Sequence, residues 1–249
     1  MISRKRLLIA LAAFAAVGIP TGVALAQSMT LDLGDASGSA TGRMIQTLAL
    51  LTVLSLAPSI LVMITSFTRI VIVLSLLRNA LGTAQSPPNA VMVSLAMFLT
   101  LFIMQPTFER SYNEGVRPLI AEEIDEATAV TRGVAPFHAF MIRHVREKDL
   151  KLFLDISRAG PVATPQETPL RALVPAFMIS ELRRAFEIGF LVFIPFLIID
   201  MVVASVLMSM GMMMLPPVLI SLPFKLIFFV LVDGWYLIAG ALVQSFGEV

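Results

Sequence analysis

Two long apolar runs in the last quarter of the chain limit what this sequence can fold into. The first runs from Ile188 to about Ser209, and the second from Pro217 to about Val243. Each run is long enough to cross a hydrocarbon core of roughly 30 Å as a helix. The residues between them include Gly211 and Pro216, which favour a turn. The sequence therefore predicts a hairpin of two membrane-type helices.

Three charged residues interrupt these runs: Asp200 in the first, and Lys225 and Asp233 in the second. Charges are costly in an apolar layer, so each of them requires a partner or a function. Asp200 and Lys225 are equally far along the chain from the centre of the predicted turn, so an antiparallel hairpin places them at about equal depth. We expect these two side chains to form a buried ion pair. Asp233 is a further charge within the predicted membrane region.

Methionines are concentrated at the predicted turn, where Met212, Met213 and Met214 are consecutive. Successive helical residues are rotated by about 100°, so these three side chains cannot share one helix face. At least part of this segment therefore belongs to the turn. Methionine is flexible and adapts to different neighbours. The segment is either an apolar hairpin tip buried in protein or lipid, or a soft, dry plug.

The N-terminus has the pattern of a secretory signal peptide. Three basic residues at positions 4–6 precede a short apolar stretch, and Ala24-Leu25-Ala26 provides a cleavage site. We expect residues 1–26 to be removed after Ala26, which makes Gln27 the first mature residue. Residues 27–43 are predicted to be a flexible tail. Removal of the three basic residues lowers the formal net charge from +1 to about −2.

Composition and missing motifs exclude several function classes. The chain is 57% apolar and only 14% charged, which is typical of integral membrane proteins. No basic run lies outside the predicted signal peptide, so we expect no nucleic-acid binding. The absence of cysteine excludes disulfides and thiolate ligands. His138 and His144 are on different helix faces without further ligands nearby, and no catalytic motif is present. We therefore expect no metal, no cofactor, no catalytic residue and no enzyme activity.

The rest of the chain is predicted to be helical. Met44–Phe67 and Val91–Phe108 are uncharged and predict a first hydrophobic hairpin over residues 44–108. The segment from Glu109 to Glu187 carries 11 basic and 12 acidic residues and has helical periodicity, without strand-like alternation.

These patterns predict an all-α integral membrane protein of helical hairpins, with about four long hydrophobic helices. Residues 109–184 form a helical extracytoplasmic insert, and residues 185–249 form the second hydrophobic hairpin with its Met-rich loop. Arg69 and Arg78 lie between the first two helices without an acidic neighbour, so this connection is expected to face the cytoplasm. A charged collar, solvated or between subunits, is expected at the outer end of the third helix and consists of Glu181, Arg183, Arg184 and Glu187.

Two functional interpretations remain. In the first, the chain is one subunit of a multi-subunit conduit whose methionine loops close a pore. In the second, it is a stand-alone secondary transporter or ion channel that uses Asp200, Lys225 and Asp233 as a relay. Four helices without an internal repeat are fewer than a repeat-built transporter usually has, which favours the conduit.

Several motifs resemble those of the FliP family of flagellar type III export-gate membrane proteins. They cover nearly everything from Leu56 onward. The motifs are Leu56-Ala57-Pro58-Ser59, Met63 to Ile70, Leu76 to Gly82 with Pro87-Pro88-Asn89, Arg146 to Leu150, Pro175-Ala176-Phe177, Ser180-Glu181-Leu182, Ile199-Asp200, Val203 to Met208, Gly211 to Pro217, Leu222 to Lys225 and Val232 to Trp235. The chain departs from the family pattern at His144-Val145 and at Tyr236, which puts only subunit contacts in doubt. The virulence-system homologues share the architecture, but the three methionines and the signal peptide favour the flagellar branch.

The resemblance implies a function and a set of partners. Family members form a homo-oligomer, expected to be a pentamer, which assembles with FliQ and FliR into a closed protein-conducting channel. Flagellar axial proteins pass through it unfolded during flagellum assembly. FlhB and FlhA of the export apparatus, the surrounding basal-body ring and membrane lipid are further expected partners. The implied location is the bacterial inner (cell) membrane within the flagellar basal body, with much of the chain on the periplasmic side. Met212, Met213 and Met214 would form the pore gasket.

Overall fold

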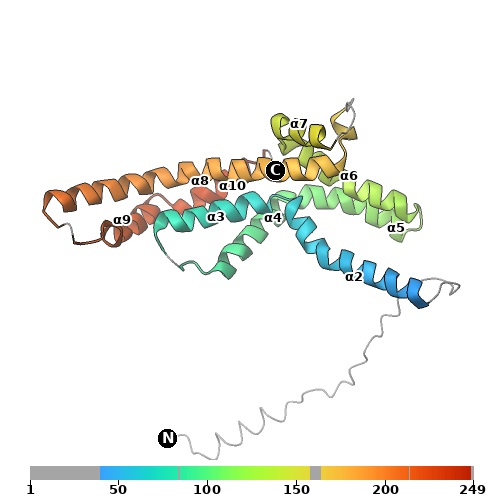
Figure 1. Ribbon diagram of the computed structural model, residues 1–249, viewed down its shortest axis with the longest axis horizontal. Coiled ribbons are helices and arrows are strands. Elements are labelled where there is room, and N and C mark those ends of the chain that lie inside the picture. Colours follow the sequence, from blue (N-terminus) through green and yellow to red (C-terminus); the bar gives the residue numbers. More distant parts are fainter. Residues whose placement is uncertain (1–39, 84, 158–163, 213, 248–249) are drawn as a thin grey trace, which may run out of the picture. The chain divides into compact units, whose positions relative to one another are not determined.

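A computed structural model describes residues 40–83, 85–157, 164–212 and 214–247 of the chain. The chain divides into two units after Ala49, and the described part of the first unit is the beginning of helix α2. The predicted cleavage site, Ala26 and Gln27, lies outside the described residues, as do residues 27–39 of the predicted tail. Every described secondary-structure element is a helix (Figure 1).

The helices follow one another in the order α2 (Ala40–Met63), α3 (Phe67–Leu81), α4 (Asn89–Ser111), the π-helical turn η1 (Tyr112–Val116), α5 (Arg117–Ile120), α6 (Glu126–His144), α7 (Glu147–Ile156), the short 3-10 helix η2 (Pro165–Glu167), α8 (Leu170–Ser209), α9 (Pro217–Leu231) and α10 (Gly234–Gln244). The prediction of an all-α membrane protein is confirmed by this element order and by the apolar helices described below.

The helix predicted over Met44–Phe67 has different bounds in the structure. α2 begins earlier, at Ala40, and ends at Met63, and a new helix begins at Phe67. Thr65 and Ser66 lie between them and are buried, and the Thr65 hydroxyl donates to the Val62 carbonyl at 3.4 Å. Short hydroxyl side chains of this kind offer the backbone an alternative to the helical hydrogen bond. The break places Arg69 in the first turns of α3 instead of in a connection.

The predicted boundary at Glu109 lies inside a continuous helical stretch. α4 runs to Ser111 and continues through η1 into α5, so the helical stretch extends from Asn89 to Ile120. Gly115 of η1 packs directly against α6, where an added Cβ would lie 2.8 Å from the Gly133 Cα. The Ser111 hydroxyl donates to the Gly133 carbonyl at 2.7 Å beside this contact. A glycine pair therefore lets α6 pack closely against the helical stretch that continues α4.

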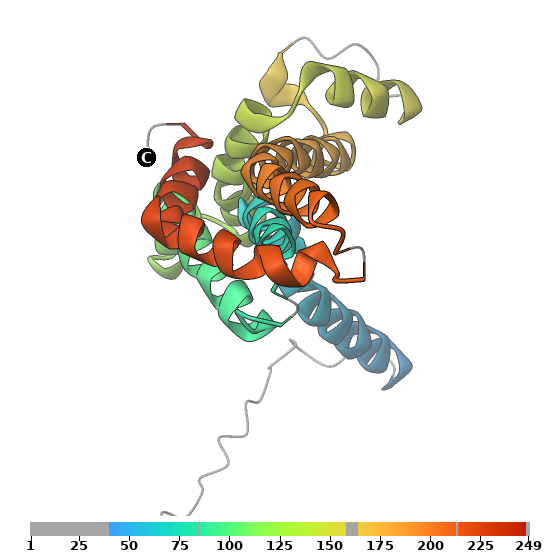
Figure 2. The same ribbon diagram turned by 90° about the vertical axis from the view of Figure 1, so that its left-hand side faces the viewer.

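The main core forms where α3 lies alongside α8 (Figures 1 and 2). Ile70, Val73 and Leu74 of α3 are fully or almost fully buried, together with Ala185 of α8 and Leu242 of α10. α8 is a single helix of 40 residues, so the boundary predicted between residues 184 and 185 also lies inside one element. The apolar face of α3 is therefore buried against other helices of the same chain.

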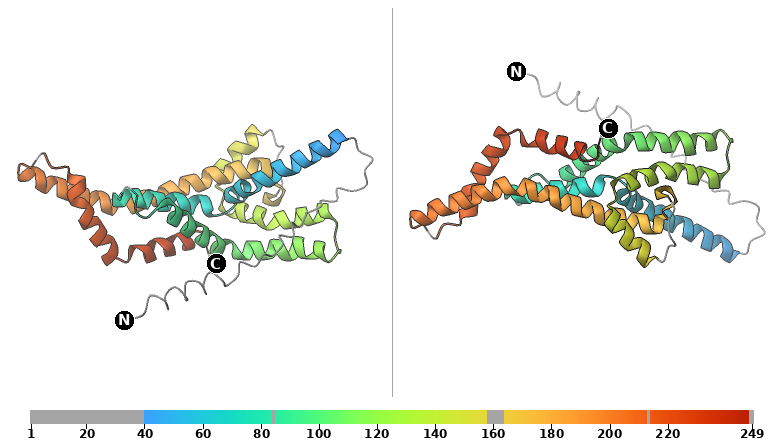
Figure 3. Two further views of the ribbon diagram at one scale, coloured as in Figure 1. Left: turned by 90° about the horizontal axis from the view of Figure 1, so that it is seen from below. Right: turned by 90° about the horizontal axis from the view of Figure 1, so that it is seen from above.

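The second run of the predicted hairpin is not one helix, as Pro217–Val243 had suggested. α9 and α10 meet at an angle of 64° (Figure 3). Asp233 at the junction has a left-handed backbone, with φ 51°. Gly234 follows, and a Cβ there would lie 2.1 Å from a ring carbon of Phe229. The bend therefore places the Phe229 ring directly against residue 234, where only glycine fits.

Among the described residues, two helical stretches are long and apolar enough to cross a membrane: Asn89–Ile120 and Leu170–Ser209. The bent pair α9 and α10 is a third if it counts as one span. With the bent pair counted as one span, three of the four long hydrophobic helices expected from the sequence are found among the described residues, and α2 is not one of them.

Candidate functional site

The Met-rich segment forms the turn between α8 and α9, at the tip of the second hairpin (Figure 3). α8 ends at Ser209, and the Met212 amide then donates to the Leu207 carbonyl at 3.0 Å. Gly211 supplies the left-handed turn residue, with φ 75°. Met212 is 43% exposed and Met214 is 98% exposed, while Met213 lies outside the described residues. The tip thus presents thioether side chains to whatever surrounds it.

Asp200 and Lys225 are in direct contact. Lys225 Nζ donates to Asp200 Oδ2 at 2.6 Å and to the Ala80 carbonyl at 3.1 Å. The Ser221 hydroxyl donates to the other carboxylate oxygen of Asp200 at 2.5 Å. The Lys225 side chain is 5% exposed and that of Asp200 is 28% exposed. The pair and its hydrogen bonds therefore tie α8 and α9 to the last turn of α3.

Asp233 does not join this pair. It is exposed at the junction of α9 and α10, and its side chain makes no hydrogen bond to the first turn of α10. No ion pair of Asp233 is present within the part of the chain that the structure describes. Its carboxylate is thus left available to a neighbouring molecule.

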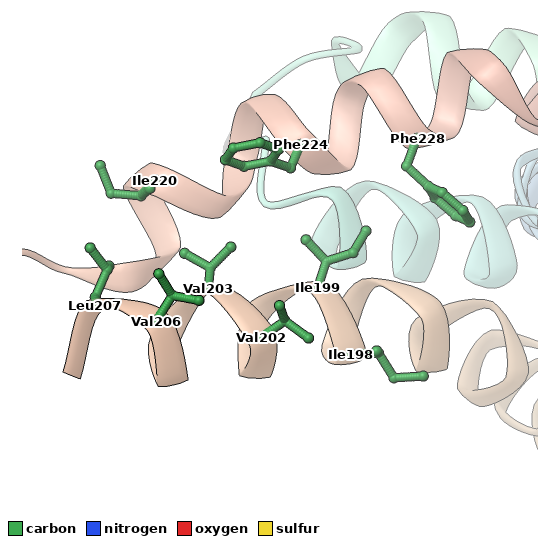
Figure 4. Close-up of a pocket in the computed structure, with 9 residues that line it drawn as sticks. All are labelled: Ile198, Ile199, Val202, Val203, Val206, Leu207, Ile220, Phe224 and Phe228. Atoms are coloured by element: carbon green, nitrogen blue, oxygen red, sulfur yellow. The ribbon is translucent and has the colours of Figure 1, made fainter. Parts of the chain in front are cut away.

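An apolar groove lies beside the ion pair, between α8 and α9 (Figure 4). Its volume is about 540 Å³, and its lining is aliphatic and aromatic. Ile199 and Val203 face it from α8, and Ile220, Phe224 and Phe228 face it from α9. The two arms of the hairpin therefore leave part of their facing surfaces uncovered by this chain.

A second ion pair, between Arg69 and Glu181, is more deeply buried than the first. Both side chains have 0% exposure. Arg69 Nε donates to Glu181 Oε2 at 2.9 Å, and Nη2 donates to Oε1. Arg69 Nη1 donates at 2.9 Å to both the carbonyl and the hydroxyl of Ser245, and the guanidinium carbon lies 3.6 Å from the centroid of the Phe246 ring. Burial lowers the pKa of Arg69, and the hydrogen bond to Glu181 and its charge oppose that shift.

This pair corrects two expectations. Glu181 is not part of an exposed collar, because it lies on the buried face of α8 with Phe177 and Leu173. Arg69 lies in helix α3 and not in a loop. It contacts Glu181, which was expected on the opposite side of the membrane, so it gives no evidence about which side its segment faces. Of the other predicted collar residues, Arg183 and Glu187 are exposed and form their own ion pair at 2.8 Å.

Both histidines are tied to backbone carbonyl groups. The ring nitrogens of His144 lie 2.8 Å from the Phe140 carbonyl and 3.1 Å from the Phe246 carbonyl. His138 Nε2 lies 2.8 Å from the Thr168 carbonyl. His144 is buried beside Phe246, which also stacks on Phe140. The residues after α10 are thus held by contacts from α3 and α6.

The sequence itself contains a signal for the burial of Glu181. Leu173, Phe177 and Glu181 recur at intervals of four, so all three lie on one face of a helix. An acidic residue that continues an apolar stripe is buried with it and requires a cation. What the sequence alone did not indicate is which arginine supplies that cation.

The described part of the chain thus defines an all-helical membrane protein whose long helices carry buried ion pairs and expose wide apolar surfaces. Comparison with known proteins assigns it more closely. The model of the FliP family matches residues 50–242, and the chain belongs to this family.

Several relatives have sequences that are more than half identical, and each is named "Flagellar biosynthetic protein FliP". The protein of Caulobacter vibrioides is 57% identical over 98% of this chain and 91% of its own length. That of Rhizobium meliloti is 53% identical over 91% of this chain and 94% of its own. That of Bacillus subtilis is 57% identical over 81% of this chain and 91% of its own. The motif-based resemblance to this family is therefore confirmed, and with it a role in flagellar biosynthesis.

Proposed function

We propose that this chain is a subunit of the flagellar type III protein export gate. In this proposal several copies, five by analogy with the family, assemble with FliQ and FliR into a closed protein-conducting channel. Flagellar axial proteins pass through that channel in an unfolded state. The gate lies in the bacterial inner membrane within the basal body, with much of each chain on the periplasmic side, next to FlhB, FlhA and the basal-body ring.

The observation that carries the proposal is the exposed apolar surface of α8. Only 11% of its most hydrophobic 18-residue segment is buried within the protein. Phe186, Phe190 and Leu191 are each more than half exposed. Exposed apolar surface on this scale marks contact with lipid or with other proteins. The family match and the open groove between α8 and α9 agree with burial against other subunits.

The methionine tip suits the closure of such a channel. Met212 and Met214 project from a turn that Gly211 and the prolines after it define. Repeated around a ring of copies, unbranched thioethers can meet, exclude water and still yield to chains of varying side-chain size. We therefore assign the Met212, Met213 and Met214 loop as the gasket of the pore.

The proposal is tested by complementation and by mass measurement on the complete complex. We expect the chain, expressed in a Caulobacter vibrioides strain that lacks its own relative, to restore motility and secretion of hook and filament proteins. Native mass spectrometry of the detergent-purified protein should give one discrete hetero-oligomer. A monomer that conducts ions or transports a small solute would contradict the proposal and would favour the stand-alone transporter.

A further inference from the structure

Among the described residues, the charges of the second hairpin do not balance. Between Ile188 and Gly247 the sequence has three charged residues, Asp200, Lys225 and Asp233. Asp200 and Lys225 satisfy each other at 2.6 Å. Asp233 is left as an unmatched carboxylate in a segment of otherwise uncharged, mostly apolar residues.

The surroundings of Asp233 are both apolar and exposed. We define the elbow surface as Val230, Leu231, Tyr236 and Leu237 together with Asp233 itself. Val230, Leu231 and Tyr236 are 75%, 79% and 74% exposed, and Leu237 is 55% exposed. The Asp233 carboxylate does not cap α10, although it lies where a capping side chain would. The apolar side chains of this surface are thus largely uncovered, and no described residue pairs with its carboxylate.

The elbow surface also lies near the middle of the apolar run that α9 and α10 form. Asp233 follows the 15-residue α9 and precedes the 11-residue α10, with a bend of 64° between them (Figure 3). Phe228 and Val232 on one side and Leu237 and Ile238 on the other continue the apolar character. A carboxylate in the middle of such a run is far from the ends, where a charged side chain could reach water. Covering this surface without a cation would leave a buried, unpaired charge.

We propose that the elbow surface docks an apolar helix of a different polypeptide, and that this helix carries an arginine or lysine opposite Asp233. This inference rests on the proposed function, since it requires an assembly with other subunits. A second copy of this chain is a weaker match, because Lys225, the one basic residue of its second hairpin after Ile188, is buried and already paired. Arg183, which is exposed on α8, already forms an ion pair with Glu187. The required partner is therefore a chain with a basic residue inside a membrane-type helix.

A photo-crosslinking experiment identifies the occupant directly. A benzophenone amino acid is introduced at Tyr236 of the full chain in the complete complex, and the crosslinked peptides are sequenced by mass spectrometry. A matched control carries the same group at Val130, which is 66% exposed but lies on α6. We expect the Tyr236 probe, and not the Val130 probe, to capture an apolar helix of another protein with an arginine or lysine close to the crosslink. Capture of lipid only, of a second copy, or of a helix without a basic residue would overturn the inference.

Charge reversal then tests the pairing itself. Asp233→Lys should lower the crosslink yield at Tyr236 about tenfold or more, because like charges would meet. Replacement of the captured arginine or lysine by aspartate should restore the yield in the Asp233→Lys background. Asp155→Lys, an exchange at an exposed carboxylate on α7, should leave the yield unchanged. An Asp233→Lys complex with a normal crosslink yield would contradict the pairing.

Native mass spectrometry of the same samples distinguishes a failure of the proposed function from a failure of the docking inference. A chain that is monomeric before any substitution would refute the proposed function. An intact hetero-oligomer without a basic helix at the elbow surface would refute only this inference.

Discussion

Two ion pairs that join different helices, Arg69–Glu181 and Asp200–Lys225, differ in how much water reaches them. Arg69 and Glu181 have no exposed side-chain surface, whereas Asp200 is 28% exposed beside Lys225. Removal of one partner from a buried pair leaves an uncompensated charge and typically costs about 3–5 kcal/mol, while replacement of both by apolar residues can be nearly neutral. Solvent screening reduces the effect where a partner is partly exposed.

Glu181→Leu alone should destabilise the protein by about 3–5 kcal/mol, because the Arg69 guanidinium would stay buried without its carboxylate. The double variant Arg69→Met/Glu181→Leu should recover much of that loss. Thermal unfolding of the purified protein in detergent measures both effects. A double variant as unstable as Glu181→Leu would mean that the Arg69 contacts with Ser245 and Phe246 contribute more than the charge balance.

Asp200 and Lys225 should compensate each other in the same way, but less strongly. Asp200→Leu or Lys225→Ala alone should lower the yield of assembled complex more than the double apolar replacement Asp200→Leu/Lys225→Met does. The reason is that Lys225 is buried and, among the described residues, its one other hydrogen-bond partner is the Ala80 carbonyl. Size-exclusion chromatography with quantitative immunoblotting gives the assembled fraction. If the double variant is as defective as the worse single variant, the two charges have separate roles.

At the scale of the elements, contacts between helices depend on a few small residues. Gly115→Ala should destabilise the protein by about 1–3 kcal/mol, because its Cβ would lie 2.8 Å from the Gly133 Cα and 2.9 Å from the Ala129 carbonyl oxygen. Gly240→Ala is the matched control. Nothing lies within 4 Å of its Cβ, so alanine should raise stability there by about 0.5–1 kcal/mol. Unfolding temperatures that shift in the same direction for both variants would contradict this interpretation.

The beginning of α6 should respond to acid. Thr128 donates to the Asp125 carboxylate through its hydroxyl at 2.5 Å and its amide at 3.3 Å, and these bonds lower the pKa of Asp125. The stabilisation is complete above the pKa of the unfolded chain, about 3.9, and is lost as the pH falls through the lower folded value. Hydrogen exchange, corrected for the intrinsic rate, should show unchanged protection in the first turn of α6 down to about pH 4, and progressive loss of protection below it. Asp125→Asn keeps an acceptor that does not titrate, so an equal loss in that variant would refute the assignment.

The sequence predicted the helical class, the turn at the methionines and the proximity of Asp200 to Lys225, because these depend on local periodicity and on symmetry about one turn. It did not predict the helix break before α3, the bend at Asp233 or the burial of Glu181. Those features depend on contacts between residues far apart in the chain. Phe229 excludes a side chain at Gly234, and Glu181 finds its cation in Arg69, 112 residues away.

At the scale of the whole molecule, this chain leaves much of its apolar surface uncovered. α8, α9 and α10 expose large side chains on several faces, while α3 is packed within the chain. The buried pairs therefore organise a subunit whose remaining surfaces are completed by lipid or by other subunits. In the proposed assembly, repetition of one chain brings many copies of one loop to a common axis.

Met212 and Met214 should close the pore in that assembly. Met212→Ala/Met214→Ala removes the filling atoms without adding charge, so small ions should leak across the membrane while protein export continues at least in part. Met97→Ala/Met201→Ala is the matched control, because both methionines are more than 40% exposed but lie within α4 and α8, away from the tip. Conductance of the purified complex in planar bilayers, and dye entry into cells, measure the leak. An assembled tip variant as tight to ions as the control would place the seal elsewhere and leave these methionines a packing role at the hairpin tip.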